Sequence, residues 1–370
     1  MRGLSVINVI ILTSITDGFT LSNPKLHTSR LLSTAPTTPA EAISFLNANI
    51  ANAPTTPPQL KPTLTYFINE YVNACTKGKS SPGEIVASFS KCISLAMKHG
   101  MGPDKYTFGV DHTAIRAPYD YYKFGVDFFR PCVDISNSVL NGQENLQKAI
   151  AQTQAGENVI FLANHQSEAD PQCVSLMFEL AGFGREAEQI HYVAGHKVTT
   201  DPLAIPFSLG RNLICIHSKK HIDVDPELKG EKQKQNVRAM GRMLEVMKSG
   251  GGMIWVAPSG GRDRRDVKSG EVPIAEFDGK TLDMFRLMAR KSKVATHFYP
   301  MSMATYDLCP PPDETVSGTG EERNVRFGSI GLCVGEEVVN EGGLDKRHDF
   351  LELAMERVEG DYNRLRKELK

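Results

Sequence analysis

Residues 164–171 carry a histidine and an aspartate with four residues between them, directly after a short apolar run. On one continuous helix, residues five positions apart diverge by about 140°, so a helix would separate His165 from Asp170. The two side chains can meet if residues 158–163 form a buried strand and Asp170 caps the next helix, with Pro171 at its first position. The carboxylate could then accept from one imidazole nitrogen while the other faces a cleft. An imidazole held in this way can serve as a general base for a hydroxyl group.

Capping alone would also explain the aspartate, and a single histidine in a turn is commonly a surface residue. Two further polar clusters follow short apolar runs, however. Residues 218–221 (Ser-Lys-Lys-His) follow the run 213–216, and residues 257–264 (Ala-Pro-Ser-Gly-Gly-Arg-Asp-Arg) follow the run 253–256. In open α/β folds, ligands bind at the edge of the sheet where parallel strands end. The three clusters therefore predict one cleft at that edge.

The third cluster favours binding of an anion. Arg262 and Arg264 alternate, so an extended backbone would point both side chains the same way. Beside them, the pair Gly260 and Gly261 leaves backbone N–H groups accessible, and two guanidiniums with such donors suit a phosphate group. The second cluster would add charge and donors through Lys220 and His221. A solvated basic loop remains the alternative interpretation.

Several other chemistries lack their motifs. No Gly-x-Gly-x-x-Gly follows a strand, and the two Gly-Lys-Ser/Thr triplets lack the first glycine of a P-loop. Ser259 is not preceded by the glycine of a nucleophile elbow, which makes it a poor nucleophile candidate. A metal site built from His165, His191 and His196 has no supporting ligand motif. We expect no metal and no cofactor.

Composition sets further bounds. With 370 residues, the chain is long enough for one large domain and a smaller one. Its net charge of −1 does not favour nucleic acid as a partner. The seven cysteines are scattered without a Cys-x-x-Cys pair, which indicates a reducing compartment rather than a disulfide framework. No run reaches the roughly 18 apolar residues of a membrane span, so we expect at most peripheral membrane contact.

The first residues have the composition of a targeting leader. Residues 4–15 form a short apolar stretch after Arg2, as in a weak signal peptide, and residues 20–38 are rich in Ser, Thr, Leu and Pro without an acidic residue. We expect residues 1–39 to be a cleaved two-part leader that lies outside the fold. A tail with no targeting role is the alternative.

The remaining chain alternates between helix and strand patterns. Apolar residues at helical spacing predict a small bundle over residues 40–110, with helices at 40–51, 62–76 and 82–99. The aromatic-rich stretch 119–139 should pack this bundle onto an α/β domain over residues 111–370. The predicted strands of that domain are residues 158–163, 190–194, 213–216, 253–256, 295–303 and 325–334. Its predicted helices are residues 171–182, 226–248, 280–292 and 344–369.

The predicted fold class is therefore α/β, with a mixed, mostly parallel sheet covered by helices and preceded by a small N-terminal helical bundle. Residues 307–323 should form a loop rich in Pro, Gly and acidic residues.

The three clusters, together with residues 112–134, resemble the soluble plastid glycerol-3-phosphate acyltransferases of the glycerolipid acyltransferase superfamily. The resemblance covers essentially everything after the leader. The His-x4-Asp element alone marks only the wider superfamily. The membrane branch of that superfamily usually has Glu where Ser259 stands, so the serine favours the soluble branch.

This resemblance implies transfer of an acyl group from acyl-acyl carrier protein to the sn-1 hydroxyl of glycerol 3-phosphate, which gives lysophosphatidate. It implies that His165 and Asp170 form the catalytic base and that Lys220, His221, Arg262 and Arg264 bind the substrate phosphate. It also implies a location in the plastid stroma, here through a two-part leader of the kind used by complex plastids. The alternatives are an acyltransferase that uses acyl-CoA or lysophosphatidate, and a non-catalytic module that binds acyl groups or carrier protein. Because carrier proteins are acidic, local basic residues such as Lys197, Lys219 and Arg265 are candidates to meet one.

Overall fold

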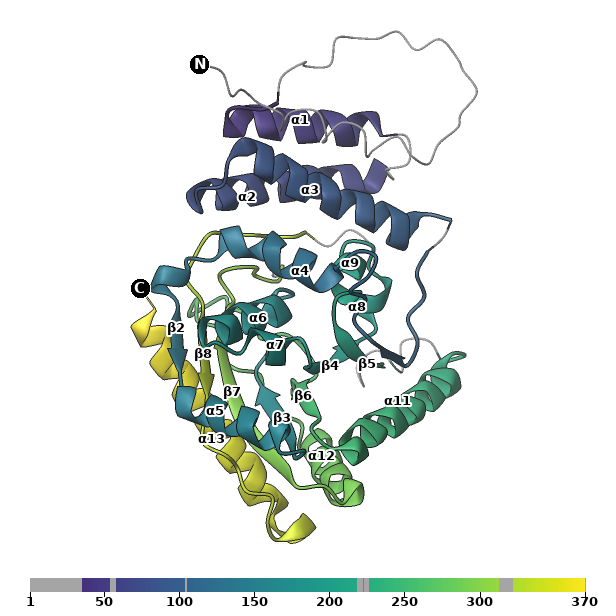
Figure 1. Cartoon of the computed structure of the whole chain (residues 1–370), viewed down its shortest axis with the longest axis vertical. Helices are drawn as coiled ribbons and strands as arrows, with labels where there is room; N and C mark the ends of the chain where they lie inside the picture. Colours follow the sequence, from purple (N-terminus) through teal and green to yellow (C-terminus); the bar gives the residue numbers. More distant parts are fainter. Residues whose placement is uncertain are drawn as a thin grey trace, which may run out of the picture. The chain divides into compact units, whose positions relative to one another are not determined.

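A computed structural model describes residues 35–53, 58–103, 105–217, 222, 226–312 and 322–369 of the chain (Figure 1). Pro36–Lys370 form one compact unit. Nearly all of the expected leader, residues 1–39, lies outside the described residues, although Thr38 caps the first helix and Pro39 begins it. The boundaries of the predicted bundle at 40–110 and main domain at 111–370 stay a prediction.

In the described part of the chain, eight strands form one sheet in the order β1-β5-β4-β6-β3-β7-β8-β2. Five neighbouring pairs are parallel, and the pairs β1–β5 and β7–β8 are antiparallel. The predicted mixed, mostly parallel sheet is confirmed. The strands are β1 (Asp111–His112), β2 (Val139–Asn141), β3 (Asn158–Ala163), β4 (His191–Gly195), β5 (Asn212–Ile216), β6 (Met253–Val256), β7 (Thr296–Ala304) and β8 (Gly331–Val334).

Strand β3 lies near the middle of the sheet, and its sequence explains why. All six of its residues are buried, as expected for a strand that is covered on both faces. Val159 and Phe161 point into one hydrophobic core, whereas Ile160 and Leu162 point into the other. The residues that follow β3 therefore leave the sheet between two helical layers.

Helices cover both faces of the sheet. The first core is shared by the N-terminal bundle and the helices between β1 and β4, and the second is shared by the helices that precede β6 and β7 and by the terminal helix. The bundle consists of α1 (Pro39–Asn52), α2 (Lys61–Lys77) and α3 (Pro82–Ala96), and the longer helices between β1 and β4 are α4 (Tyr121–Phe129), α5 (Gln143–Gln154) and α6 (Asp170–Leu180). Three single-turn helices, α7 (Gly184–Ala187), α8 (Lys197–Thr200) and α9 (Ile205–Ser208), lie between α6 and β5 in the chain. Those of the second layer are α11 (Lys229–Ser249), α12 (Gly279–Ser292) and α13 (Arg347–Glu368).

The N-terminal bundle packs on α4 through aromatic rings. Tyr71 of α2 stacks on Phe128 of α4 with ring centroids 4.2 Å apart. The Tyr71 hydroxyl donates to the backbone carbonyl of Phe128 at 3.0 Å. Phe128 also lies edge-on to Phe207 of α9. The predicted role of the stretch 119–139, which was to join the bundle to the rest of the fold, is confirmed.

The structure departs from the predicted elements at several ends. The expected strand at 325–334 forms only as Gly331–Val334, because Arg326 donates to Leu308 and Gly328 bridges to Val133 instead. Helix α11 begins at Lys229 rather than at residue 226, and its expected cap, residue 225, lies outside the described residues. Helix α3 ends at Ala96 and continues as a wider π-helical turn.

Two sequence-based expectations concern the whole chain. The seven cysteines are all free and buried, so none forms a disulfide. Among the helices that the structure describes, none combines the length and apolar character needed to cross a membrane.

Candidate active site

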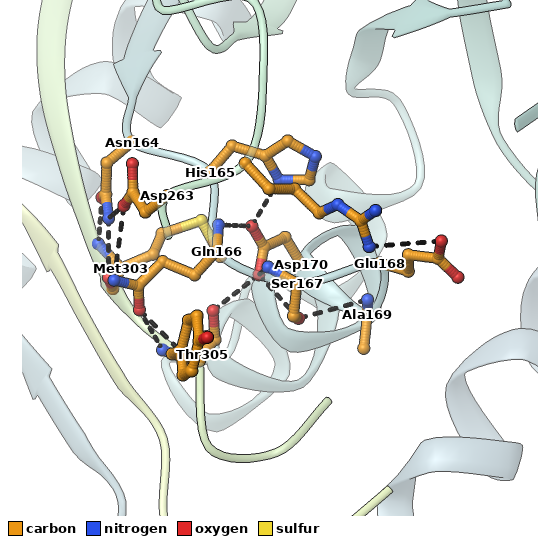
Figure 2. A network of polar contacts seen from close by, with 12 residues as sticks. Asn164, His165, Gln166, Ser167, Glu168, Ala169, Asp170, Asp263, Met303 and Thr305 are labelled. Carbon is orange, nitrogen blue, oxygen red and sulfur yellow. Dashed lines mark hydrogen bonds and ion pairs between the residues drawn. The ribbon is translucent and has the colours of Figure 1, made fainter. Parts of the chain in front are cut away.

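The structure brings the predicted histidine and aspartate together. The chain turns back after β3, and the Nδ1–H of His165 donates to Oδ2 of Asp170 at 2.7 Å (Figure 2). The Asp170 carboxylate is fully buried, whereas the His165 side chain is 27% exposed. With Nδ1 engaged in this way, the second ring nitrogen of His165 is left as the proton acceptor.

Asp170 is held by its own turn and by a distant strand. Its oxygens accept hydrogen bonds from the backbone N–H of Gln166 at 2.8 Å, from Ser167 and from the Thr305 hydroxyl at 2.6 Å. Burial alone would raise the pKa of Asp170, but the bonds from His165, Thr305 and Gln166 outweigh it and hold that pKa below its ordinary value. The carboxylate therefore stays ionised and can stabilise a charged imidazole.

One detail of the prediction for Asp170 is wrong. Helix α6 begins at Asp170 itself, Ala169 occupies the cap position, and no side chain caps that end. The carboxylate instead accepts from N–H groups of the turn that precedes the helix. The hydrogen bonds that the Asp170 carboxylate accepts therefore stabilise the turn that presents His165.

A second buried carboxylate joins this turn to the loop after β6. The backbone N–H of Asp263 donates to the carbonyl of His165 at 2.6 Å, and its carboxylate accepts from the side-chain amides of Asn164 and Gln166 (Figure 2). Burial raises the pKa of Asp263 to about 6, against the hydrogen bonds that it accepts. The loop that carries Arg262 and Arg264 is therefore fixed to the backbone of the candidate base.

The same two amides reach the end of β7. Asn164 exchanges two hydrogen bonds with the backbone of Met303, at 2.8 and 3.0 Å. The Gln166 side-chain oxygen accepts from the backbone N–H of Thr305 at 2.9 Å. Three strand ends, those of β3, β6 and β7, are thus tied into one network around the His165 turn.

The His165 ring lies beside two aromatic side chains. Its ring lies edge-on to Trp255 of β6, with centroids 5.7 Å apart. Trp255 in turn lies 5.7 Å from the ring of Tyr192, which comes from β4. The imidazole is therefore bounded by polar groups on its Nδ1 side and by apolar rings beside it, which suits a substrate with a polar end and an apolar chain.

Glu168, in the middle of the motif, pairs with two arginines. Its carboxylate lies 3.3 Å from Nη1 of Arg262 and 3.2 Å from Nε of Arg323. Arg323 also pairs with Asp201 at 2.7 Å. Burial would raise the pKa of Glu168, but Arg323, Arg262 and the nearby Lys197 lower it to about 2. Cations thus gather beside the histidine turn, as an anionic ligand would require.

The predicted phosphate residues are placed only in part. The Arg262 side chain is 11% exposed and points back to the histidine motif through Glu168. Arg264 donates to the carbonyl of Pro312 at 2.7 Å. Lys220 and His221 lie outside the described residues.

Sequence reasoning missed the partners that come from far along the chain. Thr305 is 135 positions from Asp170, and Arg323 is 155 positions from Glu168. No local pattern marks either residue. Glu168 lies inside the motif 164–171, and Asp263 lies inside the motif 257–264. The only sequence signal for a role of either residue is its position among charged neighbours.

Within the described ranges, no group of three or more His, Cys, Asp and Glu side chains is arranged to hold a metal ion.

Comparison with known proteins agrees with this geometry. Residues 138–304 match the family model described as Acyltransferase. A chloroplastic glycerol-3-phosphate acyltransferase of Arabidopsis thaliana is 42% identical over 269 residues, which are 72% of this chain and 58% of the relative. The corresponding protein of Spinacia oleracea is 40% identical over 247 residues, which are 66% of this chain and 52% of the relative.

A chloroplastic relative from Cucurbita moschata is 38% identical over 283 residues, or 76% of this chain and 61% of the relative. The chain thus spans between half and two thirds of the length of these relatives. The resemblance expected from the sequence blocks is confirmed. Residues 138–304, which contain the His165–Asp170 pair, thus match an acyltransferase family model in a chain similar to chloroplastic glycerol-3-phosphate acyltransferases.

Proposed function

We propose that this chain transfers a fatty acyl group from acyl-acyl carrier protein to the sn-1 hydroxyl of glycerol 3-phosphate and so forms lysophosphatidate. The observation that carries the proposal is the buried, ionised Asp170 bonded to Nδ1 of a partly exposed His165. Relatives named as glycerol-3-phosphate acyltransferases support the choice of acceptor.

The chemistry needs one positioned base and no covalent enzyme intermediate. His165 takes the proton of the acceptor hydroxyl as its oxygen attacks the thioester carbonyl. Asp170 holds the tautomer and stabilises the imidazolium, as the aspartate does in a serine protease triad. When the tetrahedral intermediate collapses, the C–S bond breaks, and the thiolate can take the proton back from His165. An ester and a free thiol are the products.

The acceptor phosphate is assigned to Arg262, Arg264, Lys220 and His221. The support for Arg262 is its position beside the histidine turn through Glu168. The support for Arg264 is its place in the loop that Asp263 ties to the His165 carbonyl. Guanidinium groups bind phosphate with two parallel hydrogen bonds, which would fix the distance between the phosphate and the reacting hydroxyl.

Replacing the base tests the proposal directly. We expect His165→Ala to lower kcat by about 10²–10⁴-fold, the contribution typical of a positioned base, while the KM for glycerol 3-phosphate changes little. Asp170→Asn should also lower kcat, because it removes the counter-charge of the imidazolium. The measurement is release of free thiol from the acyl donor, with and without glycerol 3-phosphate.

Gln154→Ala, an exposed residue on α5, is the matched control and should leave both constants unchanged. Retention of most of the activity in His165→Ala would exclude the histidine as base. If wild-type protein released no thiol from any acyl donor, the chain would instead be a non-catalytic module that binds acyl groups or carrier protein.

Two related activities are the alternatives within the same chemistry. An enzyme that used acyl-CoA would show a lower KM for that donor than for acyl-carrier protein. An enzyme that acylated lysophosphatidate would discriminate against glycerol 3-phosphate. A panel with two donors and two acceptors separates these cases.

We also propose that the chain works in the plastid stroma and that a cleaved, two-part leader lies within residues 1–39. The chloroplastic names of the relatives support the organelle. The acid-free composition of residues 20–38 supports the leader. A fluorescent protein fused behind residues 1–39 should enter plastids, and its retention in the cytosol would contradict this assignment.

A further inference from the structure

A cleft of about 450 Å³ lies between α11 and α12 of the second helical layer. Methionine and leucine side chains supply its apolar lining, and two lysines and an aspartate lie among them. The lining residues are Met240, Gly241, Leu244, Lys280, Asp283, Met284, Leu287, Met288 and Lys291. Leu287 is 37% exposed, and Val237, one turn before Gly241, is 73% exposed. Apolar surface of this kind on a folded protein commonly marks an interaction site.

The cleft lies between two helices whose N-terminal ends are at the sheet edge that carries His165. Helices α11 and α12 precede β6 and β7, which both run parallel to β3, so both helices have their N-terminal ends at the edge where His165 lies. Asn236 of α11 exchanges two hydrogen bonds of 2.8 Å with the backbone of His217, which directly follows β5. Asp278, the cap of α12, donates its backbone N–H to Pro258, which lies in the loop that leads to Arg262.

The two helices are strongly basic in a chain with a net charge of −1. Helix α11 carries six basic residues and two acidic ones, and α12 carries four basic residues and one acidic one. Lys280 and Lys291 are exposed, and neither forms an ion pair within the described part of the chain. The lining of the cleft thus combines methionine and leucine side chains with Lys280 and Lys291, while its one acidic residue, Asp283, lies 3.7 Å from Nη1 of Arg286.

We propose that this α11–α12 cleft is the docking site for the acidic protein that carries the acyl group as a thioester. The inference rests on the proposed function. A negatively charged amphipathic helix would place its apolar residues against the methionines and its carboxylates against Lys280 and Lys291. Methionine side chains adapt to different apolar partners, which suits a transient complex.

Two basic residues expected from the sequence to meet the carrier are engaged elsewhere. Lys197 is half-buried, and its pKa is lowered by burial, with Glu168, Arg262 and Arg323 close by. Arg265 bonds to Gly270 and Asp307. The third, Lys219, lies outside the described residues.

Gly241 allows the cleft to be filled without disturbing the fold. A Cβ added there meets no atom within 4 Å, and glycine is an unfavourable residue inside a helix. Gly241→Leu should therefore fold at least as well as the wild type while it occupies the docking space. Gly360→Leu is the matched control, because Gly360 lies inside α13, is exposed and is equally unobstructed.

The experiment compares one acyl chain on two donors, carrier protein and coenzyme A, with glycerol 3-phosphate as acceptor. We expect Gly241→Leu, and separately the double variant Lys280→Glu/Lys291→Glu, to raise the KM for acyl-carrier protein by about tenfold. The kinetic constants for acyl-CoA should stay unchanged, because coenzyme A has no protein surface to dock. Gly360→Leu should match the wild type with both donors.

Equal effects on both donors, or no effect on the carrier, would overturn the docking site. Binding of each variant to vesicles of phosphatidylglycerol tests a lipid surface as the occupant. Loss of vesicle binding with an unchanged KM for acyl-carrier protein would assign the cleft to lipid and reject the proposal. If the wild-type protein acylated glycerol 3-phosphate from neither donor, the proposed function itself would be wrong. That outcome differs from a failure of the docking site, in which the wild type is active with both donors.

Discussion

Glu168 and Asp170 are two residues apart, yet their carboxylates bond to different partners. Asp170 accepts from His165, from the turn and from Thr305, so its charge is directed at the candidate base. Glu168 is directed away from the histidine, toward Arg262 and Arg323. One short motif thus orients both the proton acceptor and a cation of the proposed phosphate site.

Arg262 provides a prediction at this scale. We expect Arg262→Ala to raise the KM for glycerol 3-phosphate by about tenfold to a hundredfold, since charge-assisted hydrogen bonds contribute roughly 1.5–3 kcal/mol. Arg262→Lys should recover only part of the loss, because lysine keeps the charge without the planar pair of donors. The KM for the acyl donor should move little in either variant.

Arg265→Ala is the control for this measurement. Its guanidinium pairs with an exposed carboxylate on Asp307, an arrangement that contributes little. If Arg262→Ala weakened the donor and left the acceptor unaffected, the arginine would belong to the donor site.

The decrease in the free energy of unfolding at acidic pH should depend on Glu168. Its pKa is about 2 in the folded chain, compared with an ordinary value of 4.5. Because the folded pKa is depressed, this carboxylate stabilises the fold fully above about pH 4.5, and that contribution is lost as the pH falls toward about 2. Linkage sets an upper limit of about 3 kcal/mol on the effect.

Glu168→Gln should therefore flatten the loss of stability between about pH 5 and about pH 3, measured as the urea midpoint. Glu276→Gln, which changes an exposed glutamate, serves as control. If the urea midpoint of the Glu168 variant fell with pH as it does in the wild type, the ion pairs with Arg262 and Arg323 would not stabilise the fold.

At the scale of elements, the start of α1 sets the shortest chain that should be fully stable. Thr38 accepts from the backbone N–H of Glu41, and the Glu41 carboxylate accepts in return from the backbone of Thr37 and Thr38. A chain that begins at Pro36 keeps this capping box, whereas one that begins at Pro39 loses it. We expect the shorter chain to be less stable by about 1 kcal/mol in urea unfolding, with equal activity.

Thr38→Ala in the longer chain should reproduce the loss without a change in length. Equal stability of all three proteins would mean that α1 is held by its packing alone.

Elements with a strong periodic pattern were predictable, and elements without one were not. The sequence predicts β3 and β6 with their observed bounds because each is a short apolar run, which in β3 follows Asn158. Helix α4 has seven buried residues out of nine, and its polar side consists of Lys123 and Asp127 alone, which is too few residues to establish a helical period in sequence. Strands β1 and β2 have two and three residues, which is too short for any pattern.

The candidate site divides in a similar way. The pairing of His165 with Asp170 could be predicted because both residues lie in one turn whose direction is set by the strand before it. The contacts of Thr305 and Arg323 depend on how distant strands and loops pack, and a single sequence holds no signal for that.

At the scale of the whole molecule, one hydrophobic core runs from the N-terminal bundle through α4 to the sheet. We expect residues 36–370 to unfold in a single transition for that reason. The chain has one tryptophan, Trp255, and it lies beside His165, so its fluorescence reports on the site. Far-ultraviolet circular dichroism reports on all helices, including those of the bundle.

The two signals should give the same midpoint in urea. Phe128→Ala, which removes a ring between the bundle and α9, should lower both midpoints together. A far-ultraviolet transition that precedes the fluorescence change would show instead that the bundle unfolds as a separate domain.

The ties between β3 and β7 also order events during synthesis. A ribosome that has released the chain only as far as β6 has already delivered residues 164–170. The chain still lacks Met303, which bonds to Asn164, and Thr305, which bonds to Gln166 and Asp170, about 140 positions later. Until β7 pairs with β3, the turn has buried amides without partners, and Asp170 lacks one of its donors. The turn that presents the proposed base is therefore fully supported only after most of the chain has left the ribosome.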